Sequence, residues 1–254
     1  MSRRESGDSM YHFFIQAYQV RDGIIKIEGS DVNHIANVLR MKPGEEVSVT
    51  DENRVEYHCR IESLEREAVW LEILSQSHED VELPADIYLF QGLPKGDKME
   101  LIIQKMIELG AYQIVPMATK RCVVKLDAKK AAAKTKRWNA IAESAAKQSK
   151  RGIIPQVIEP VTYKQALTMA KDMDMLLIPY EEAENMEQTR EIISTIKTGM
   201  NVGIFIGSEG GFAKEEVEMA QQSGAKEITL GKRILRTETA GMMLMSVLMY
   251  FMEE

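Results

Sequence analysis

Short apolar runs alternate with polar turns over the first eighty residues. The runs are rich in β-branched and aromatic residues, and clusters of turn residues separate them, which predicts strands. These strands cover 13–17, 24–28, 46–50, 55–61 and 69–74. One helix is predicted for 31–40, with Ser30 or Asp31 as its N-cap. Closely spaced strands with a single helix indicate a small barrel, and the polar stretch 75–84 is the predicted linker.

Strands and helices alternate after this linker. Strands are predicted for 86–91, 113–119, 175–179, 202–206 and 227–230. Helices are predicted for 98–109, 128–149, 163–171, 184–195, 214–222 and 242–252. Apolar strands that alternate with helices imply a mostly parallel sheet with both faces covered. We therefore expect two domains, a small β-barrel over 1–78 and an α/β domain over 79–254.

Glycine-rich turns follow two of the late strands, where ligands bind in parallel sheets. The sequence GSEGGF begins at Gly207, and LGKRILRTETAG places Gly231 just before Arg236 and Glu238 at a helix start. Glycine lets the backbone approach a ligand closely. Neither turn matches the known phosphate-binding motifs, and Glu209 would repel a phosphate. The pattern predicts a neutral or cationic cofactor beside a reaction site.

The charge distribution changes the expected partner. The chain of 254 residues has a net charge of −7, with ordinary apolar (44%) and charged (28%) fractions. The segment 120–151, however, contains eleven basic residues and only two acidic ones, Asp127 and Glu143, which gives it a local charge of +9. Such a segment can steer RNA to one face, or it can be a solvated lysine-rich helix. Charge alone leaves both open. The candidate phosphate contacts are Lys134, Lys136, Arg137, Lys150 and Arg151.

Other classes of protein fit poorly. The polar start MSRRESGDSM lacks the apolar core of a signal peptide, and the longest apolar run falls short of the roughly 20 residues of a membrane span. Cys59 and Cys122 lack CxxC spacing, and the four histidines have no metal-ligand spacing. We expect a cytoplasmic protein without a metal or a membrane partner.

Several motifs in a fixed order resemble one family. They are HIANVLRMKPGEEV (34–47), KGDKMELIIQKMIELGA (95–111), KQSKR…P (147–155), GSEGGF and LGKRILRTETA, with an early aromatic cluster at 11–14. Together they are similar to the SPOUT-superfamily methyltransferases of bacteria that modify N3 of a uridine in 16S ribosomal RNA. The likeness covers almost the whole chain.

This resemblance implies a PUA-like barrel followed by an α/β domain whose end forms a trefoil knot. It also implies S-adenosylmethionine as methyl donor, a homodimer, and 16S ribosomal RNA or the small ribosomal subunit as partner. The cofactor would lie among three turns, held by Pro179, Gly207, Gly211, Leu230, Gly231, Leu235 and Thr239. Core packing is the alternative explanation for each leucine.

The implied reaction needs a charge stabiliser and a base. Uracil N3–H is a weak acid, so Arg236 is the first candidate because its permanent charge can stabilise the developing anion. Glu238 and then Glu209 are the candidate bases. Ordinary N-capping by Thr237 to Thr239, with Glu238 favoured by the helix dipole, is an equally simple account of these residues.

Three other functions remain open. The same fold could serve a methyltransferase acting on another RNA, such as transfer RNA, or a non-catalytic RNA-binding factor. A nucleotide-dependent oxidoreductase is disfavoured because the dinucleotide fingerprint is missing.

Five of the 17 methionines lie in the apolar helix 242–252, which must be buried. A homodimer would cover it, and a core position within one chain is the alternative.

Overall fold

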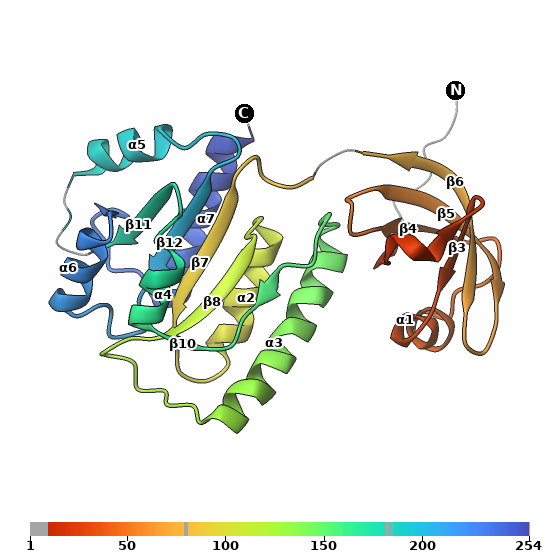
Figure 1. The fold of residues 1–254 in the computed structure, drawn as a ribbon, viewed down its shortest axis with the longest axis horizontal. Helices are drawn as coiled ribbons and strands as arrows, with labels where there is room; N and C mark the ends of the chain where they lie inside the picture. The colour runs from red at the N-terminus through yellow and green to blue at the C-terminus, as the bar shows by residue number, and fades with distance from the viewer. Residues whose placement is uncertain (1–9, 79–80, 181–182, 184, 254) are drawn as a thin grey trace. The chain divides into compact units, whose positions relative to one another are not determined.

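The chain divides into two compact units in the computed structural model, which describes residues 10–78, 81–180, 183 and 185–253. The first unit comprises 1–82 together with 147–153, and the second comprises 83–146 and 154–254 (Figure 1). The segment 147–153 therefore groups with the first unit, although it follows a long helix of the second.

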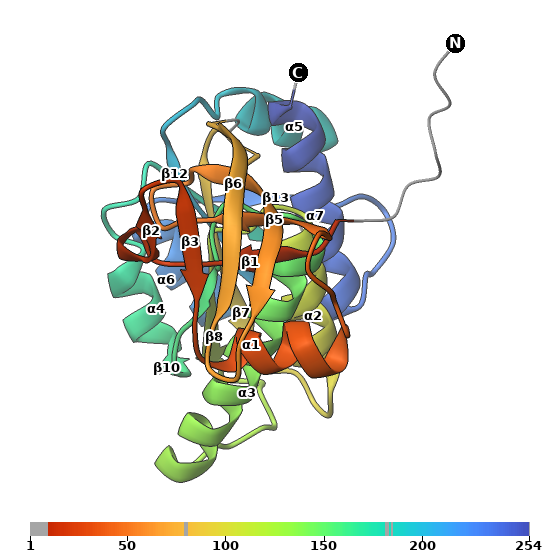
Figure 2. The same cartoon turned by 90° about the vertical axis from the view of Figure 1, so that its right-hand side faces the viewer.

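A six-stranded sheet forms the first unit, in the order β1-β4-β5-β6-β3-β2, and Figure 2 shows β3, β6 and β5 side by side. Its elements are β1 (His12–Phe14), η1 (Ala17–Gln19), β2 (Val20–Arg21), β3 (Ile24–Ile27), α1 (Ser30–Asn33), η2 (His34–Val38), β4 (Glu46–Thr50), β5 (Glu56–Leu64) and β6 (Val69–Ser77). Alternate residues of the strands, such as Ile25, Val47 and Leu71, are fully buried. This inward alternation, with η2 contributing Ile35, builds the core of the unit.

Several boundaries of this unit differ from the sequence prediction. The strand predicted for 13–17 ends at Phe14, because Gln16 and Gln19 form a capping box around the 3₁₀ turn η1. The helix predicted for 31–40 is shorter and splits into α1 and a π-helical turn. The predicted linker 75–84 begins too early, since Ser77 still pairs with Glu56 in the sheet. Residues 79–80 lie outside the described residues.

His12 is a buried titratable group in this sheet, with 6% of its surface exposed. Ser48 Oγ donates its proton to Glu56, so the Ser48 oxygen accepts from His12 Nδ1 at 3.2 Å. His12 Nε2 is buried with no hydrogen-bond partner among the described residues. Burial, together with the charges of Lys150 and Lys147, lowers the pKa of His12 to about 4 against the opposing effect of Glu56. The folded state therefore favours the neutral ring.

We expect the stability of this unit to fall as the pH drops from 6.5 towards 4. In that window the unfolded chain binds a proton at His12 that the folded chain resists, because the folded pKa of about 4 lies below the ordinary value of 6.5. At pH 4.5 this difference costs roughly 2–3 kcal/mol relative to pH 7. Urea unfolding at both pH values measures it. The His12→Asn variant should lose correspondingly less stability, and parallel losses in both proteins would contradict the assignment.

The second unit contains a parallel sheet in the order β10-β8-β7-β12-β11-β13, with β9 paired to β8. Its elements are β7 (Asp86–Gly92), α2 (Lys98–Glu108), β8 (Gln113–Ala118), α3 (Ala128–Gln148), β9 (Gln156–Val157), β10 (Val161–Thr162), α4 (Tyr163–Met169), β11 (Met175–Pro179), α5 (Met186–Ser194), β12 (Asn201–Ile206), α6 (Lys214–Gln222), β13 (Ala225–Ile228) and α7 (Thr237–Met252). The predicted parallel strand–helix alternation is confirmed.

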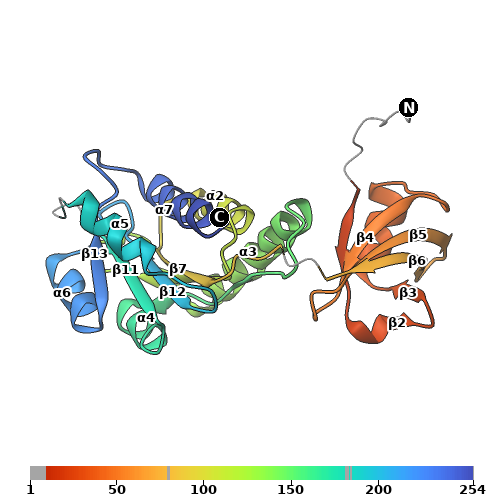
Figure 3. The same cartoon turned by 90° about the horizontal axis from the view of Figure 1, so that it is seen from above.

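Helices cover both faces of this sheet. Helices α4 and α6 lie on one face, where Tyr163 and Val217 pack with Phe90 and Phe205 of the strands. Helices α2 and α7 pack against each other on the opposite face (Figure 3). Several predicted boundaries of this unit were wrong. Strand β13 ends at Ile228 instead of 230, and α7 begins at Thr237, five residues earlier than the apolar run indicated. The predicted start of α5 at 184 lies outside the described residues.

Helix α7 is buried along one side only in this single chain. Leu244, Met245 and Leu248 are almost fully buried, whereas Tyr250 is 72% exposed and Phe251 42%. Leu101 of the adjacent α2 is 44% exposed. The alternative that this helix is a core helix within one chain is thus wrong, because α2 and the sheet cover only one side of it, and the homodimer stays a prediction. Elsewhere, no helix within the described ranges is both long and apolar enough to cross a membrane.

Candidate active site

Four turns lie together at the carboxyl end of the parallel sheet, after β7, β11, β12 and β13. Strand β12 lies between β7 and β11, and β13 lies beyond β11. Gln91 at the end of β7 pairs with Ile206, and Pro179 at the end of β11 pairs with Ile228. The turns that start after these residues therefore leave the sheet side by side. They include the turn after Pro179, the Gly207 turn and the turn of Leu230 and Gly231. Pro179 and Gly231 are more than fifty residues apart in the sequence.

Close backbone packing explains the glycines of the GSEGG turn. A Cβ on Gly207 would lie 2.9 Å from backbone atoms of Gly211, and a Cβ on Gly210 would lie 2.9 Å from Arg121 Cβ. Gly211 adopts a left-handed φ of +64°. Gly92 at the end of β7 is tighter still, since its Cβ would lie 2.5 Å from Ser208 N. These glycines are needed for the packing and backbone conformation of the turn itself. From the sequence we had explained them by the close approach of a ligand.

The second turn is held by two threonines. Thr229 N donates to Thr189 Oγ1 at 3.0 Å, and Gly231 N donates to Thr229 Oγ1 at 3.2 Å. Gly231 has a φ of +102°, where a side chain would be strained. A Cβ there would meet Met186 Cε at 3.7 Å, so space around this glycine is open by comparison with Gly207. Leu230 and Leu235 on either side of the turn are half-buried.

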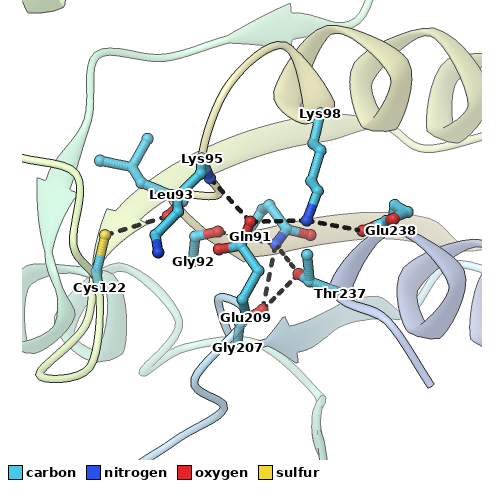
Figure 4. A network of polar contacts seen from close by, with 10 residues as sticks. All are labelled: Gln91, Gly92, Leu93, Lys95, Lys98, Cys122, Gly207, Glu209, Thr237 and Glu238. Atoms are coloured by element: carbon cyan, nitrogen blue, oxygen red, sulfur yellow. Dashed lines mark hydrogen bonds and ion pairs between the residues drawn. The ribbon is translucent and has the colours of Figure 1, made fainter.

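A buried glutamine joins the Gly207 turn to the start of α7 (Figure 4). Gln91 Nε2 donates to Thr237 Oγ1 at 2.9 Å, and Thr237 Oγ1 donates to the Gly207 carbonyl at 2.6 Å. The N-cap of α7 is Arg236, with no side-chain cap. The N-capping explanation for Thr237 is therefore wrong, because its hydroxyl bonds to another turn. The sequence analysis gave Gln91 no role. The available signal was a polar residue directly after the apolar run 87–90.

Lys98 lies between the two candidate bases. Its Nζ is 2.8 Å from Glu209 Oε1 and 3.9 Å from Glu238 Oε2. Partial burial on its own would raise the pKa of Glu209, but hydrogen bonds from the Lys98 ammonium and the Lys95 backbone outweigh it and lower that pKa. Glu209 is thus a weak base, and its Oε1 already accepts from both donors. Glu238 Oε2 is buried and accepts no hydrogen bond within the described part of the chain.

Arg236 is exposed at the start of α7, and its guanidinium has no hydrogen bond or ion pair to any described residue. It directly precedes Thr237, which is bonded to the Gly207 turn. The structure therefore brings together Gly207, Arg236, Glu238 and Glu209, four of the residues singled out in the sequence. Thr239, one turn into the same helix, is exposed. In the described ranges, no group of three or more His, Cys, Asp or Glu could hold a metal ion.

The basic candidates separate into exposed and buried groups. Lys136 and Arg137 are exposed on α3, although Arg137 Nε also lies 2.8 Å from Glu100. Lys134 Nζ lies 5.8 Å from the Trp138 ring at a cavity of about 210 Å³ beside the 93–97 turn. Lys150 is exposed in the segment that groups with the first unit. These four remain candidate phosphate contacts.

Arg151 is different because it is buried, with 4% of its surface exposed. Its Nε donates to both carboxylate oxygens of Glu82 at 2.9 and 3.0 Å, and Gly152 N donates to the same carboxylate. A guanidinium in a buried ion pair is not available to a phosphate. We therefore withdraw Arg151 from the RNA candidates and assign it a structural role.

Replacing Arg151 with leucine should destabilise the first unit by about 3–5 kcal/mol, because it leaves the Glu82 charge buried and uncompensated. Urea unfolding measures the loss, and the double variant Arg151→Leu with Glu82→Leu should recover most of it. The exposed Lys136→Ala is the matched control, with unchanged stability and a weaker salt dependence of RNA binding. An Arg151→Leu protein of normal stability that binds RNA poorly would restore the original assignment.

Comparison with known proteins identifies the family. Residues 81–249 match the RNA methyltransferase domain, and residues 27–74 match the RNA methyltransferase PUA domain. The chain is 37% identical over 247 residues to ribosomal RNA small subunit methyltransferase E of Bacillus subtilis (strain 168), covering 95% of this chain and 96% of that protein. The chain belongs to the ribosomal RNA small subunit methyltransferase E family. The resemblance seen in the sequence motifs is thereby confirmed.

Solved structures of similar proteins agree with this placement. A methyltransferase of Legionella pneumophila with the bound cofactor SAM is 30% identical, with a TM-score of 0.83 over 95% of this chain and 97% of that chain. A ribosomal RNA small subunit methyltransferase E from Neisseria gonorrhoeae, bound to S-adenosyl methionine, is also 30% identical, with a TM-score of 0.81 over 95% and 97%. The predicted PUA-like domain followed by an α/β methyltransferase domain is confirmed.

Proposed function

We propose that this protein transfers a methyl group from S-adenosylmethionine to N3 of a uridine in 16S ribosomal RNA. The observation that carries the proposal is one juxtaposition. Two glycine turns leave β12 and β13, the strands on either side of β11, and Arg236 and Glu238 follow the second turn, in a chain 30% identical over 95% of its length to an enzyme bound to S-adenosyl methionine. The ribosomal substrate follows from the names of the relatives, and it implies action in the cytoplasm, where ribosomes assemble.

The turns fit such a cofactor. Open space at Gly231 and the half-buried Leu230 and Leu235 offer an apolar recess for an adenine ring. Ser208 Oγ is buried within the Gly207 turn and has no hydrogen-bond partner in the described chain, so it can bond a polar group of a ligand. Pro179, Gly207, Gly211 and Thr239 complete the proposed cofactor residues. When bound, S-adenosylmethionine supplies an electrophilic methyl group on a sulfonium.

The residues of the chain supply the acid–base chemistry. Loss of the N3 proton places negative charge on the two uracil oxygens, and N3 would then take the methyl group while the sulfonium would leave as a neutral thioether. The free Arg236 guanidinium can donate to those oxygens and stabilise the charge. Glu238 is the proposed proton acceptor because its buried Oε2 has no hydrogen bond. Glu209, engaged by Lys95 and Lys98, is better suited to holding the turn than to accepting a proton.

RNA reaches this site as an unpaired or flipped nucleotide, since N3 lies on the pairing edge of uracil. Half-buried Lys134 and exposed Lys136, Arg137 and Lys150 are the proposed phosphate contacts, and binding through them should weaken steeply with salt. The PUA domain of the first unit supports an RNA partner, because the matched family is described as an RNA methyltransferase PUA domain. The trefoil knot implied by the sequence motifs stays a prediction.

The test is transfer of labelled methyl from S-adenosylmethionine to small ribosomal subunits of a strain that lacks this gene, followed by mass spectrometry of the RNA. We expect one methylated uridine in 16S ribosomal RNA, carrying the label at N3. Label in transfer RNA would favour the other-RNA alternative. Tight RNA binding without any transfer would favour a non-catalytic factor, and reduction of a nicotinamide cofactor would favour an oxidoreductase.

We further propose a homodimer formed through α2 and α7. Leu101, Val247, Tyr250 and Phe251 expose apolar surface on these two packed helices, and such surface is costly in water. Sedimentation should show a dimer of wild-type chains, and Tyr250→Arg should shift it towards monomer because a charge would be buried. The exposed Tyr18→Arg in the other unit serves as control. A wild-type monomer at micromolar concentration would contradict this proposal.

A further inference from the structure

The geometry points to Gln91 and Thr237 as positioning residues that fix the cofactor turn relative to the start of α7. This inference rests on the proposed function, because it assigns the Gly207 turn to the cofactor and Arg236 to the reaction. Neither residue contacts the reacting atoms in this account. Each acts by holding groups that do.

Gln91 is fully buried at the end of an otherwise apolar strand. Its Nε2 carries two hydrogens, which lie near three acceptors. Thr237 Oγ1 and the Gly92 carbonyl are both at 2.9 Å, and the Gly207 carbonyl is at 3.4 Å. A buried amide is costly unless it is hydrogen-bonded. Its Nε2 is hydrogen-bonded to three different parts of the chain, the end of β7, the turn after β12 and the first residue of α7, whereas its Oε1 is buried with no hydrogen-bond partner among the described residues.

The direction of each bond in this cluster is determined. The one proton of the Thr237 hydroxyl goes to the Gly207 carbonyl at 2.6 Å, since a carbonyl can only accept. The Thr237 oxygen must then accept from Gln91 Nε2. A flipped Gln91 amide would set its oxygen against two carbonyls and a hydroxyl with no proton to give. The amide therefore has one favourable orientation, and the cluster has one arrangement.

The cluster lies between the two halves of the proposed site (Figure 4). On one side, Gly207 begins the cofactor turn. On the other, Arg236 and Glu238 flank Thr237 in the sequence. Glu209, in the middle of the same turn, is bonded to Lys95 N at 3.0 Å and Lys98 Nζ at 2.8 Å. The turn is thus held at two points before any ligand arrives, which reduces the ordering that binding requires.

Loss of this arrangement should affect reaction geometry more than folding. Displacement of a reacting group by about 1 Å can cost roughly 100-fold in rate. Thr237→Val keeps the shape of the side chain but has no proton for the Gly207 carbonyl and no acceptor for Gln91. We expect kcat to fall roughly 10- to 100-fold, with a smaller rise in KM for S-adenosylmethionine. Thr237→Ser keeps the hydroxyl and should restore most of the rate.

The experiment has two readouts on purified full-length protein. Hydrogen exchange followed by mass spectrometry reports the opening of amides 207–212 without any ligand. Steady-state methyl transfer reports kcat and KM. Tyr163→Phe is the matched control, since it removes another buried hydroxyl that donates to a backbone carbonyl, Glu216 O at 2.7 Å, on the other face of the sheet. If Thr237→Val does not fold, Thr237→Cys provides the same test with a weak donor of similar size.

We expect faster exchange of 207–212 and a lower kcat in Thr237→Val, near-normal values in Thr237→Ser, and unchanged exchange of 207–212 in Tyr163→Phe. Unaltered exchange and kcat in a folded Thr237→Val protein would overturn the inference. Equal losses in Tyr163→Phe would also overturn it, because they would show a general effect of lost buried bonds. A wild-type protein without methyl transfer would refute the proposed function instead, and the exchange data would still judge the cluster.

Discussion

Arg236→Ala is expected to slow methyl transfer by about 100- to 1000-fold, the usual effect of removing one donor that stabilises a developing anion. The guanidinium is exposed, has no partner among the described residues, and stands next to the residue that is bonded to the Gly207 turn. Since Arg236 is proposed to contact the uracil and not the cofactor, the affinity for S-adenosylmethionine should change little. Single-turnover kinetics at saturating RNA isolate the chemical step.

Two further variants sharpen this test. Arg236→Lys keeps the charge but loses the planar fork of donors, so an intermediate rate is expected. Arg233→Ala removes an exposed cation three residues before Arg236, in the segment between Gly231 and α7. This variant should leave the rate of the chemical step near that of the wild type. If Arg233→Ala and Arg236→Ala reduce the rate equally, the effect is a general loss of RNA attraction. Wild-type turnover by Arg236→Ala would remove this residue from the mechanism.

Gly92→Ala is expected to abolish measurable binding of S-adenosylmethionine. The added Cβ would lie 2.5 Å from Ser208 N and 2.9 Å from Gly207 C, and both contacts are with backbone. Backbone held in a sheet cannot yield as a flexible side chain can, so the Gly207 turn must move away from β7. That shift would also separate Gln91 from the Gly207 carbonyl, 3.4 Å away. Calorimetric titration with the cofactor measures the loss.

Gly241→Ala is the matched control for Gly92→Ala. Gly241 lies in α7 near the same cluster, but a Cβ there would make ordinary contacts, 3.7 Å to Met106 Sδ and 3.8 Å to Ile206 Cγ1. Alanine in a helix interior is favoured over glycine by about 0.5–1 kcal/mol, so this variant should bind normally and be slightly more stable. Normal cofactor binding by Gly92→Ala would contradict the assignment of the Gly207 turn to the cofactor.

Local patterns predicted most of the elements, because periodicity and turn residues act over short distances. Glu46–Thr50, Met175–Pro179 and Lys214–Gln222 have the predicted bounds. The misplaced ends have local or pairing causes that periodicity cannot show. A capping box ends the first strand at Phe14, and pairing with β5 extends β6 to Ser77.

The candidate site was predictable where glycines and charges stand out in the sequence, as at Gly207 and Arg236. The contacts that hold it were not, since they join distant segments. Gln91 and Thr237 are 146 residues apart, and nothing in either segment indicates the other. Arg151, in contrast, received a role in RNA binding from the sequence that its burial does not support. It looked like one more cation in a basic run, yet its partner Glu82 lies 69 residues earlier and buries it.

The most direct test of the account is equilibrium dialysis of the purified protein against labelled S-adenosylmethionine. The account predicts saturable binding of one cofactor per chain, with retention lost in Gly92→Ala and kept in Arg236→Ala. Binding that does not saturate, or that is the same in wild type and Gly92→Ala, would contradict the claim that these glycine turns form the cofactor site.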